Sequence, residues 1–177
     1  MHKNLLEFHN YINDLAASDV VMQMDHYIQH GDITTLEHVV AVSYTSFVLA
    51  KRFGADVRTT VRAAMLHDLY LYDWHIKDPE TRPPLTHGFT HPAKAAENAK
   101  KYFEPTEKEL RIIRSHMWPL TLFHMPTSKE ALIVTMADKY CATNETLGKY
   151  DDSALRDKVK EYLIYIKKLR AQENKMH

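Results

Sequence analysis

Apolar residues recur at steps of three and four positions along much of the chain, which is the spacing of one face of an α-helix. The pattern begins close to the first residue and predicts an amphipathic helix over residues 3–16, with apolar positions at Leu5, Phe8, Ile12 and Leu15. Ser18 is a typical N-cap and Gly31 a typical C-terminal stop, so a second helix is expected between them.

Further helices follow from the same spacing together with capping and helix-breaking residues. They are expected to run from Asp32 or Thr34 to Phe53, from about Asp56 to Tyr70, from Thr90 to Phe103, from Thr106 to about His116, from Ser128 to Leu147 and from Ser153 to about Gln172. Gly54 and Gly148 stand directly after two of these helices, and Thr106 forms a capping box with Glu109. Pro92 is expected in the first turn of its helix, where no backbone donor is needed.

Two stretches rich in proline break the helical pattern. Residues 77–84 contain three prolines, and Pro119 and Pro126 bracket a second stretch, so irregular loops are predicted in both places. The chain shows no internal repeat and no low-complexity segment. We therefore expect an all-α fold, a single-domain bundle of about seven or eight helices over residues 1–177, with its motif-bearing core at about residues 32–148.

Composition and charge narrow the class of protein and its partners. Lys and Arg number 23, as do Asp and Glu, so the net charge of the 177 residues is zero and no cationic field favours nucleic acid or an anionic membrane. Four glycines and seven prolines leave little material for the turns of an all-β fold. With a single cysteine, Cys141, and no apolar signal-peptide core near its first residue, the protein is expected to be cytoplasmic.

Histidine is frequent, with 12 residues, and several histidines stand among apolar neighbours inside predicted helices. His67 and Asp68 are adjacent near the end of one helix, and Asp138 closes an apolar run in which an unpaired carboxylate would be costly to bury. Three further predicted helices carry His38, His91 and His116. Imidazole nitrogens and carboxylate oxygens suit divalent ions such as those of Mn, Fe, Co and Zn, so we expect a metal site in the core of the bundle.

The order of these residues resembles the HD superfamily of metal-dependent phosphohydrolases over residues 36–145. The local sequences that carry the resemblance are Thr35-Leu36-Glu37-His38, Ala64-Met65-Leu66-His67-Asp68, His91-Pro92 and Ala137-Asp138-Lys139-Tyr140. The resemblance implies that one metal ion is held by His38, His67, Asp68 and Asp138. It also implies that His91 and His116 match the two extra histidines of members with two metal ions, in which Asp68 would bridge both ions.

The resemblance further implies hydrolysis of a phosphate ester or nucleotide-like small molecule by a metal-bound hydroxide. The expected cofactor is one or two divalent ions of Fe, Mn, Zn, Co or Ni. The sequence departs from the cyclic-dinucleotide phosphodiesterase branch, because Tyr70 and Leu71 replace the Gly and Lys expected there. The Gly-Tyr-Pro element of that branch is also replaced, by Met117-Trp118-Pro119-Leu120 after His116. Both departures argue against cyclic di-GMP hydrolysis.

Several polar residues near the predicted ligands are candidates for catalysis beside Asp68. Lys94 and Lys139 are candidates to neutralise charge in the transition state. Asp73 and Glu37 are alternative proton donors to the leaving group. For the two lysines, an ordinary solvated side chain is the competing interpretation.

Three other histidines need a decision between metal binding and a plainer role. His87 competes with His91, since residues four apart share a helix face, but the capping residue before His91 favours His91 as the ligand. His26 and His30 have the same spacing, yet no carboxylate pattern surrounds them, and they are predicted to lie on the surface.

Two other functions fit the same types of ligand. Some proteins of the HD fold use them to hold a di-iron centre that activates oxygen, and a sensing or scaffold domain would keep its metal for stability alone. A phosphohydrolase with a small phosphorylated or nucleotide-like substrate is the leading hypothesis. The apolar stripe of the last helix, which includes Leu155, Val159 and Tyr162, is explained by core packing or by a homodimer interface.

Overall fold

The computed structural model describes residues 3–75, 87–150 and 153–173. Its elements in chain order are α1 (Lys3–Ala16), α2 (Asp19–Met22), the 3-10 helix η1 (Gln23–His26), β1 (Ile28–His30), β2 (Ile33–Thr34), α3 (Thr35–Phe53), α4 (Val57–Leu66), α5 (His87–Tyr102), α6 (Glu107–Ser115), α7 (Lys129–Thr146) and α8 (Ala154–Glu173). Over these described ranges the fold has eight α-helices and one small two-stranded sheet, which confirms the predicted helical class.

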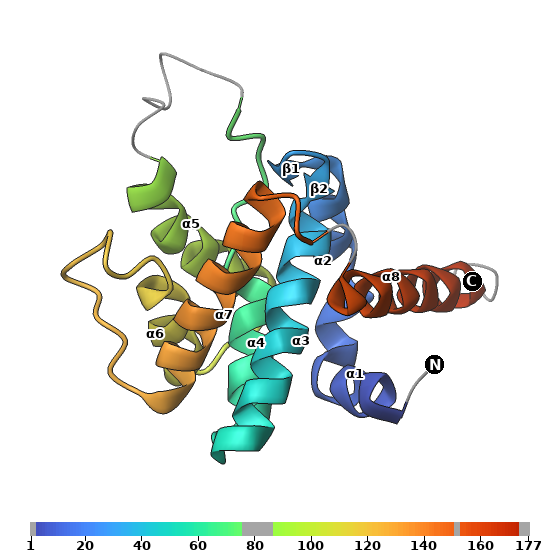
Figure 1. Cartoon of the computed structure of the whole chain (residues 1–177), viewed down its shortest axis with the longest axis horizontal. Coiled ribbons are helices and arrows are strands. Elements are labelled where there is room, and N and C mark those ends of the chain that lie inside the picture. The colour runs from blue at the N-terminus through green and yellow to red at the C-terminus, as the bar shows by residue number, and fades with distance from the viewer. Residues whose placement is uncertain (1–2, 76–86, 151–152, 174–177) are drawn as a thin grey trace.

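Helices α3, α4 and α7 form the centre of the molecule (Figure 1). Helix α3 packs along both α4 and α7, while α5 and α6 pack on one another and α6 also contacts α4 and α7. On the other side, α1 packs on α4 and α8 packs on α3 (Figure 1). The five helices α3 to α7 therefore enclose a common interior, and these are the helices on which the sequence placed the polar ligand-type residues.

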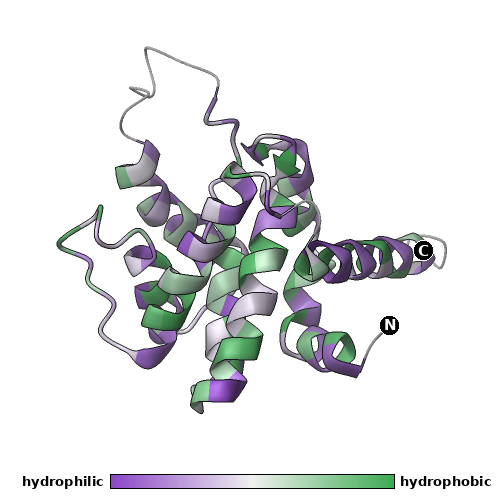
Figure 2. Ribbon diagram, in the orientation of Figure 1, coloured by the Kyte–Doolittle hydropathy of each residue, from purple (hydrophilic) through white to green (hydrophobic). Residues whose placement is uncertain are grey.

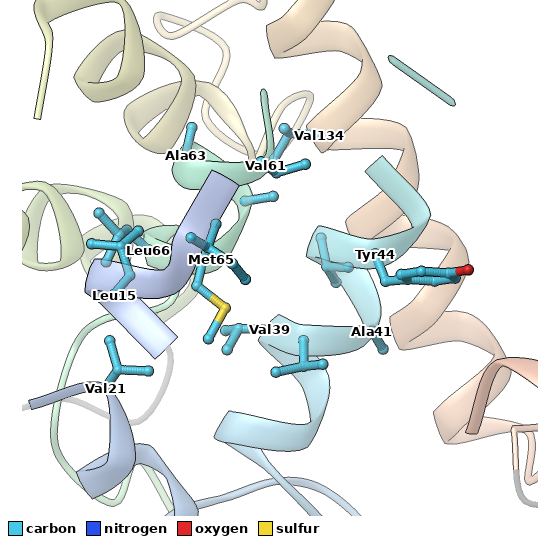
Figure 3. Packing of buried hydrophobic residues seen from close by; sticks show 14 of the residues in the cluster. Leu15, Val21, Val39, Ala41, Tyr44, Val61, Ala63, Met65, Leu66 and Val134 are labelled. Carbon is cyan, nitrogen blue, oxygen red and sulfur yellow. The ribbon is translucent and has the colours of Figure 1, made fainter. Parts of the chain in front are cut away.

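Apolar side chains from α1, α3 and α4 interlock in the core. Figure 3 shows Met65 of α4 directed toward Val39 of α3, with Leu15 of α1 close by. Burying one such aliphatic side chain stabilises the fold by about 1.5–3 kcal/mol. Helix α8 alternates hydrophilic and hydrophobic residues along its length (Figure 2), and its buried residues include Tyr162, whose ring centroid lies 5.1 Å from that of Phe8.

The predicted ends of the long helices are set by their capping residues. Gly54 follows α3 in the left-handed conformation with φ of 61°, which an L-residue with a Cβ adopts at a cost. Thr106 and Glu109 form the predicted capping box at the start of α6. Among the described residues, no helix is both long and apolar enough to cross a membrane.

The prediction of one helix from Ser18 to Gly31 is wrong. Ser18 does cap a helix, but α2 is only one turn long and leads through η1 into a β-hairpin whose strands pair Ile28 with Thr34. Tyr27 and Ile28 favour extended backbone, and Gly31 at φ of 58° supplies the turn of the hairpin instead of a helix end. The hairpin folds back over the start of α3.

Two other helix boundaries differ from the prediction. Helix α4 ends at Leu66 and not at Tyr70, because the chain turns after His67 and the amide of Tyr70 bonds to the carbonyl of Asp68 at 2.8 Å. Helix α5 begins at His87, one turn before the predicted start, so that Pro92 lies inside the helix and not in its first turn. The predicted loop at residues 77–84 lies outside the described residues.

Candidate metal centre

The structure brings together all six residues that the sequence singled out as metal ligands. They come from the beginning of α3, the turn after α4, the second turn of α5, the C-cap of α6 and the middle of α7. Each is at most 5% exposed, and the set comprises His38, His67, Asp68, His91, His116 and Asp138. Six polar side chains in an apolar interior need partners of their own, and the geometry shows where those partners lie.

Asp68 stands at the centre of the cluster, with one carboxylate oxygen toward each of two pairs of histidines. Its Oδ1 lies 3.2 Å from Nε2 of His91 and 3.5 Å from Nε2 of His116. Its Oδ2 lies 3.5 Å from Nε2 of His67 and 3.8 Å from Nε2 of His38. Because α4 ends just before it, the Asp68 side chain projects from a turn into the space between the helices.

Asp138 completes the group around His38 and His67. Its Oδ1 lies 3.4 Å from Nε2 of His38 and 3.8 Å from Nε2 of His67. Three sets of three side chains have their nearest ligand atoms within 4.8 Å of one another, and these sets overlap through shared residues: His38, His67 and Asp68; His67, His116 and Asp138; Asp68, His91 and His116. The donors thus form one continuous cluster and not three separate sites.

Each of the four histidines is held by its Nδ1 atom, which leaves its Nε2 atom directed into the cluster. The Nδ1 partners are a Glu145 carboxylate oxygen for His38 at 2.8 Å and backbone carbonyls for the others, Ala64 for His67 at 2.7 Å, His87 for His91 at 2.9 Å and Ile113 for His116 at 2.7 Å. A carbonyl only accepts hydrogen bonds, so the Nδ1 atoms that face one carry the proton. Anchors of this kind fix the tautomer and ring orientation of metal-binding histidines.

The free nitrogen atoms are arranged in a way that calls for a cation. The Nε2 atoms of His91 and His116 lie 2.8 Å apart and converge beside Oδ1 of Asp68, and each ring is anchored through its Nδ1 atom to a backbone carbonyl. Nε2 of His38, Nε2 of His67 and Oδ1 of Asp68 are buried without a hydrogen-bond partner in the part of the chain that the structure describes. These atoms are nitrogen and oxygen donors of the kind that divalent transition metals bind, so the residues present fit such an ion.

The electrostatics of the metal-free cluster point the same way. Burial favours the neutral acids, but the surrounding histidines hold the pKa of both Asp68 and Asp138 well below the ordinary range, so both are carboxylates. Burial and the neighbouring histidines lower the pKa of His116 to about 3, so its ring is neutral. Burial also acts to lower the pKa of His38, but the Glu145 carboxylate and Asp138 outweigh burial and raise it to about 10.

Two polar residues that were not among the candidates expected from the sequence also contact the cluster. Glu145 anchors His38, and a signal for it exists, because Glu145 lies seven residues after Asp138 and so on the same face of α7. Gln29 donates a hydrogen bond from Nε2 to Oδ2 of Asp68 at 2.8 Å. No pattern pointed to Gln29, because its position depends on the hairpin that the sequence did not predict.

Of the four predicted catalytic residues that are not expected ligands, one lies beside the cluster and three have their contacts elsewhere. Lys139 lies at the edge of the cluster, where its half-exposed Nζ is 2.8 Å from Oδ2 of Asp138. The other three point to partners elsewhere. Lys94 pairs with Glu97, Asp73 accepts hydrogen bonds from His75, and Glu37 pairs with Arg156.

The remaining histidines also find distinct places. The ring of His87 stacks on that of His91 with centroids 4.6 Å apart, and the backbone carbonyl of His87 bonds to Nδ1 of His91. His87 therefore holds a predicted ligand in place. The prediction of a surface position holds for His26, which is exposed. It is wrong for His30, which is partly buried with its ring edge-on to His38 at 5.9 Å, because the hairpin folds over α3.

Comparison with known proteins adds a family to this geometry. The family model for the HD domain matches residues 35–143, which contain all six residues of the cluster. A comparison with curated proteins finds no match, nor does a comparison with solved structures.

Proposed function

The chain belongs to the HD domain family over residues 35–143, and on this basis we propose that it is a metal-dependent phosphohydrolase acting on a small phosphate ester or nucleotide-like molecule. The observation that carries the proposal is the position of Asp68, which directs one carboxylate oxygen to His38 and His67 and the other to His91 and His116. A carboxylate between two sets of imidazoles is suited to two divalent ions.

The division of the donors follows from the distances. His38, His67, Asp138 and Oδ2 of Asp68 would hold one ion, while His91, His116 and Oδ1 of Asp68 would hold a second. When bound, divalent ions supply Lewis acidity toward a phosphoryl oxygen and lower the pKa of bound water toward neutrality. The donor set accommodates Mn, Fe, Co, Ni or Zn, and the native ion is left to metal analysis.

The chain's own side chains would orient the imidazole ligands, exclude bulk water and supply a positive charge for the substrate. The four Nδ1 anchors hold the imidazoles in place before any ligand binds, so no reorganisation of the rings is required. The burial of the six residues excludes bulk water, which strengthens electrostatic interactions at the centre. Lys139 offers an ammonium group beside Asp138 on the accessible side, where the negative charge of a phosphate would be attracted.

The test begins with metal analysis of the protein purified without chelator. Phosphorylated metabolites are then screened for hydrolysis with Mn, Co, Ni, Zn, Fe or Mg added back. Asp68→Ala is expected to lose both bound metal and phosphatase activity, and Lys100→Ala, an exposed substitution on α5, is expected to keep both. Unchanged metal content in Asp68→Ala would refute the assignment of the centre.

The same experiment separates the rival functions. Iron as the bound metal together with oxygen consumption and no phosphate release would favour a di-iron oxygenase. A melting temperature that falls on chelation, without turnover of any phosphate or oxidisable substrate, would favour a metal-stabilised sensing domain. A broad negative screen of metal-loaded protein would therefore overturn the hydrolase proposal and leave the metal centre intact.

A further inference from the structure

A buried amide from the β-hairpin touches the carboxylate at the middle of the cluster. Gln29 is 8% exposed, and its Nε2 donates a hydrogen bond to Oδ2 of Asp68 at 2.8 Å. The neighbouring strand residue Ile28 is exposed, in keeping with the alternation of side chains along a strand. The hairpin thus directs the Gln29 side chain inward, and that side chain reaches a predicted metal ligand.

The orientation of the Gln29 amide is fixed on both sides. Its Oε1 accepts hydrogen bonds from the hydroxyl of Tyr70 and, at 3.3 Å, from Oγ1 of Thr35. Turning the amide over would place Oε1 against the Asp68 carboxylate, where two acceptors repel each other. The side chain therefore presents its N–H to Asp68 and has no alternative arrangement of comparable stability.

The residues of this network come from three separate elements that surround the cluster. Gln29 lies in β1, Thr35 lies in the first turn of α3 ahead of His38, and Tyr70 lies in the turn that carries Asp68. The backbone amide of Thr35 donates to the carbonyl of Tyr27 at 2.7 Å, which ties the hairpin to α3. The network therefore connects the position of the hairpin to the rotation of the Asp68 carboxylate.

We propose that Gln29 is a positioning residue for the metal centre, an inference that rests on the proposed function. Its N–H occupies one lone-pair direction of Oδ2, which leaves that oxygen a single direction toward His38 and His67. With Oδ2 held, Oδ1 is directed to His91 and His116 and keeps its lone pairs for an ion there. Gln29 would thereby hold the two oxygens of Asp68 toward their separate pairs of histidines, so that each oxygen stays available to an ion on its own side.

The test is titration of chelator-treated protein with Co²⁺, followed by the absorption spectrum of the bound ion, the number of ions bound and the melting temperature before metal is added. Gln29→Leu keeps the size of the side chain and removes the donor. Because partners of metal ligands typically contribute 10–100-fold to metal affinity, Co²⁺ should bind about 10–100-fold more weakly, with the larger loss for the second ion, and the spectrum should change. Gln23→Leu makes the same replacement at an exposed position of η1 and should bind Co²⁺ like the wild type.

The outcomes separate this inference from the proposed function, because the titration requires no turnover. Gln29→Leu that folds and binds two Co²⁺ ions with unchanged affinity and spectrum overturns the positioning role and leaves the hydrolase proposal standing. Wild-type protein that binds Co²⁺ but hydrolyses no phosphate overturns the hydrolase proposal alone. If Gln29→Leu does not fold, Tyr70→Phe removes the donor to Oε1 of Gln29 and should weaken Co²⁺ binding in the same direction, and unaltered binding in that variant refutes the inference.

Discussion

Nδ1 of His38 lies 2.8 Å from a carboxylate oxygen of Glu145, and both side chains are inaccessible to solvent. The pair joins the beginning of α3 to the end of α7, two helices that pack side by side in the centre of the fold. The Glu145 carboxylate increases the basicity of the His38 imidazole, whose Nε2 atom faces Asp68 and Asp138. Glu145, which is outside the set of expected ligands, therefore fixes the orientation of one of them, His38.

Glu145→Gln is expected to weaken metal binding by about 10–100-fold, because the amide keeps the shape of the side chain but loses the charge that orients and polarises His38. Titration of the metal-free protein with Mn²⁺ or Co²⁺ measures the change. Glu104→Gln makes the same substitution at an exposed site and should leave the affinity unaltered. Equal affinity in Glu145→Gln and the wild type would show that the carboxylate has no such role.

Metal affinity is expected to increase with pH between about 7 and 9, by up to tenfold per unit, because binding must displace the proton of His38. The pKa of this imidazole in the metal-free protein is raised to about 10, so the ring is protonated in that range. The number of protons released on binding of the ion that His38 holds, measured calorimetrically in buffers of different ionisation enthalpy, should approach one at pH 8 in excess of protons from bound water. If His38→Gln released as many protons on metal binding as the wild type, the protons would not come from His38.

The raised pKa of His38 also makes the stability of the metal-free protein depend on pH. A histidine whose folded pKa exceeds its unfolded value of about 6.5 stabilises the fold fully below pH 6.5 and loses that contribution as the pH rises through the folded pKa. For His38 the loss therefore falls between pH 6.5 and about 10. Urea denaturation of wild type and His38→Gln across this range should show a stability difference that narrows as the pH rises.

The two groups of donors should be separable by mutation. His91→Ala removes a donor from the group around Oδ1 of Asp68 and leaves His38, His67 and Asp138 in place, so the capacity for metal should fall from two ions toward one. Metal analysis after equilibration with excess Mn²⁺ and gel filtration measures this capacity. His124→Ala replaces an exposed histidine and is expected to leave the capacity as it is. Loss of all metal in a folded His91→Ala protein would argue for one shared site.

The residues of the cluster could be found from the sequence because each violates the local pattern of its helix. A histidine or aspartate among alanines, valines and isoleucines, as at Asp138, is costly to bury unless it shares a site with others. The helical period singles out these residues as candidates, and the resemblance to the HD superfamily implied which of them would be ligands. Residues far apart in the sequence were thereby identified whose side chains meet in the structure.

The residues that support the cluster could not be found in the same way. Gln29 reaches Asp68 only because residues 28–34 form a hairpin, and the caps at Ser18 and Gly31 were equally compatible with a helix. Conversely, the proximity of Glu37 to His38 in the sequence suggested a catalytic role, whereas successive residues of a helix point about 100° apart and Glu37 faces Arg156 of α8. Tertiary contacts, and not sequence distance, decide which polar groups share the site.

Lys139→Gln is expected to weaken the binding of a phosphorylated substrate and to leave the metal in place. The Lys139 side chain is 42% exposed and its Nζ lies 2.8 Å from Oδ2 of Asp138, so the lysine is accessible to a ligand while Asp138 is buried. A hydrogen bond to a charged group contributes about 1.5–3 kcal/mol, which corresponds to an increase in KM of about 10–150-fold if the bond is direct.

The measurement is KM and inhibition by inorganic phosphate for the substrate found in the screen, with metal content determined in parallel. Lys149→Gln, at an exposed position beyond α7, provides the matched control. An unchanged KM with full metal content would exclude Lys139 from substrate binding, whereas loss of metal would indicate that its role is to hold Asp138.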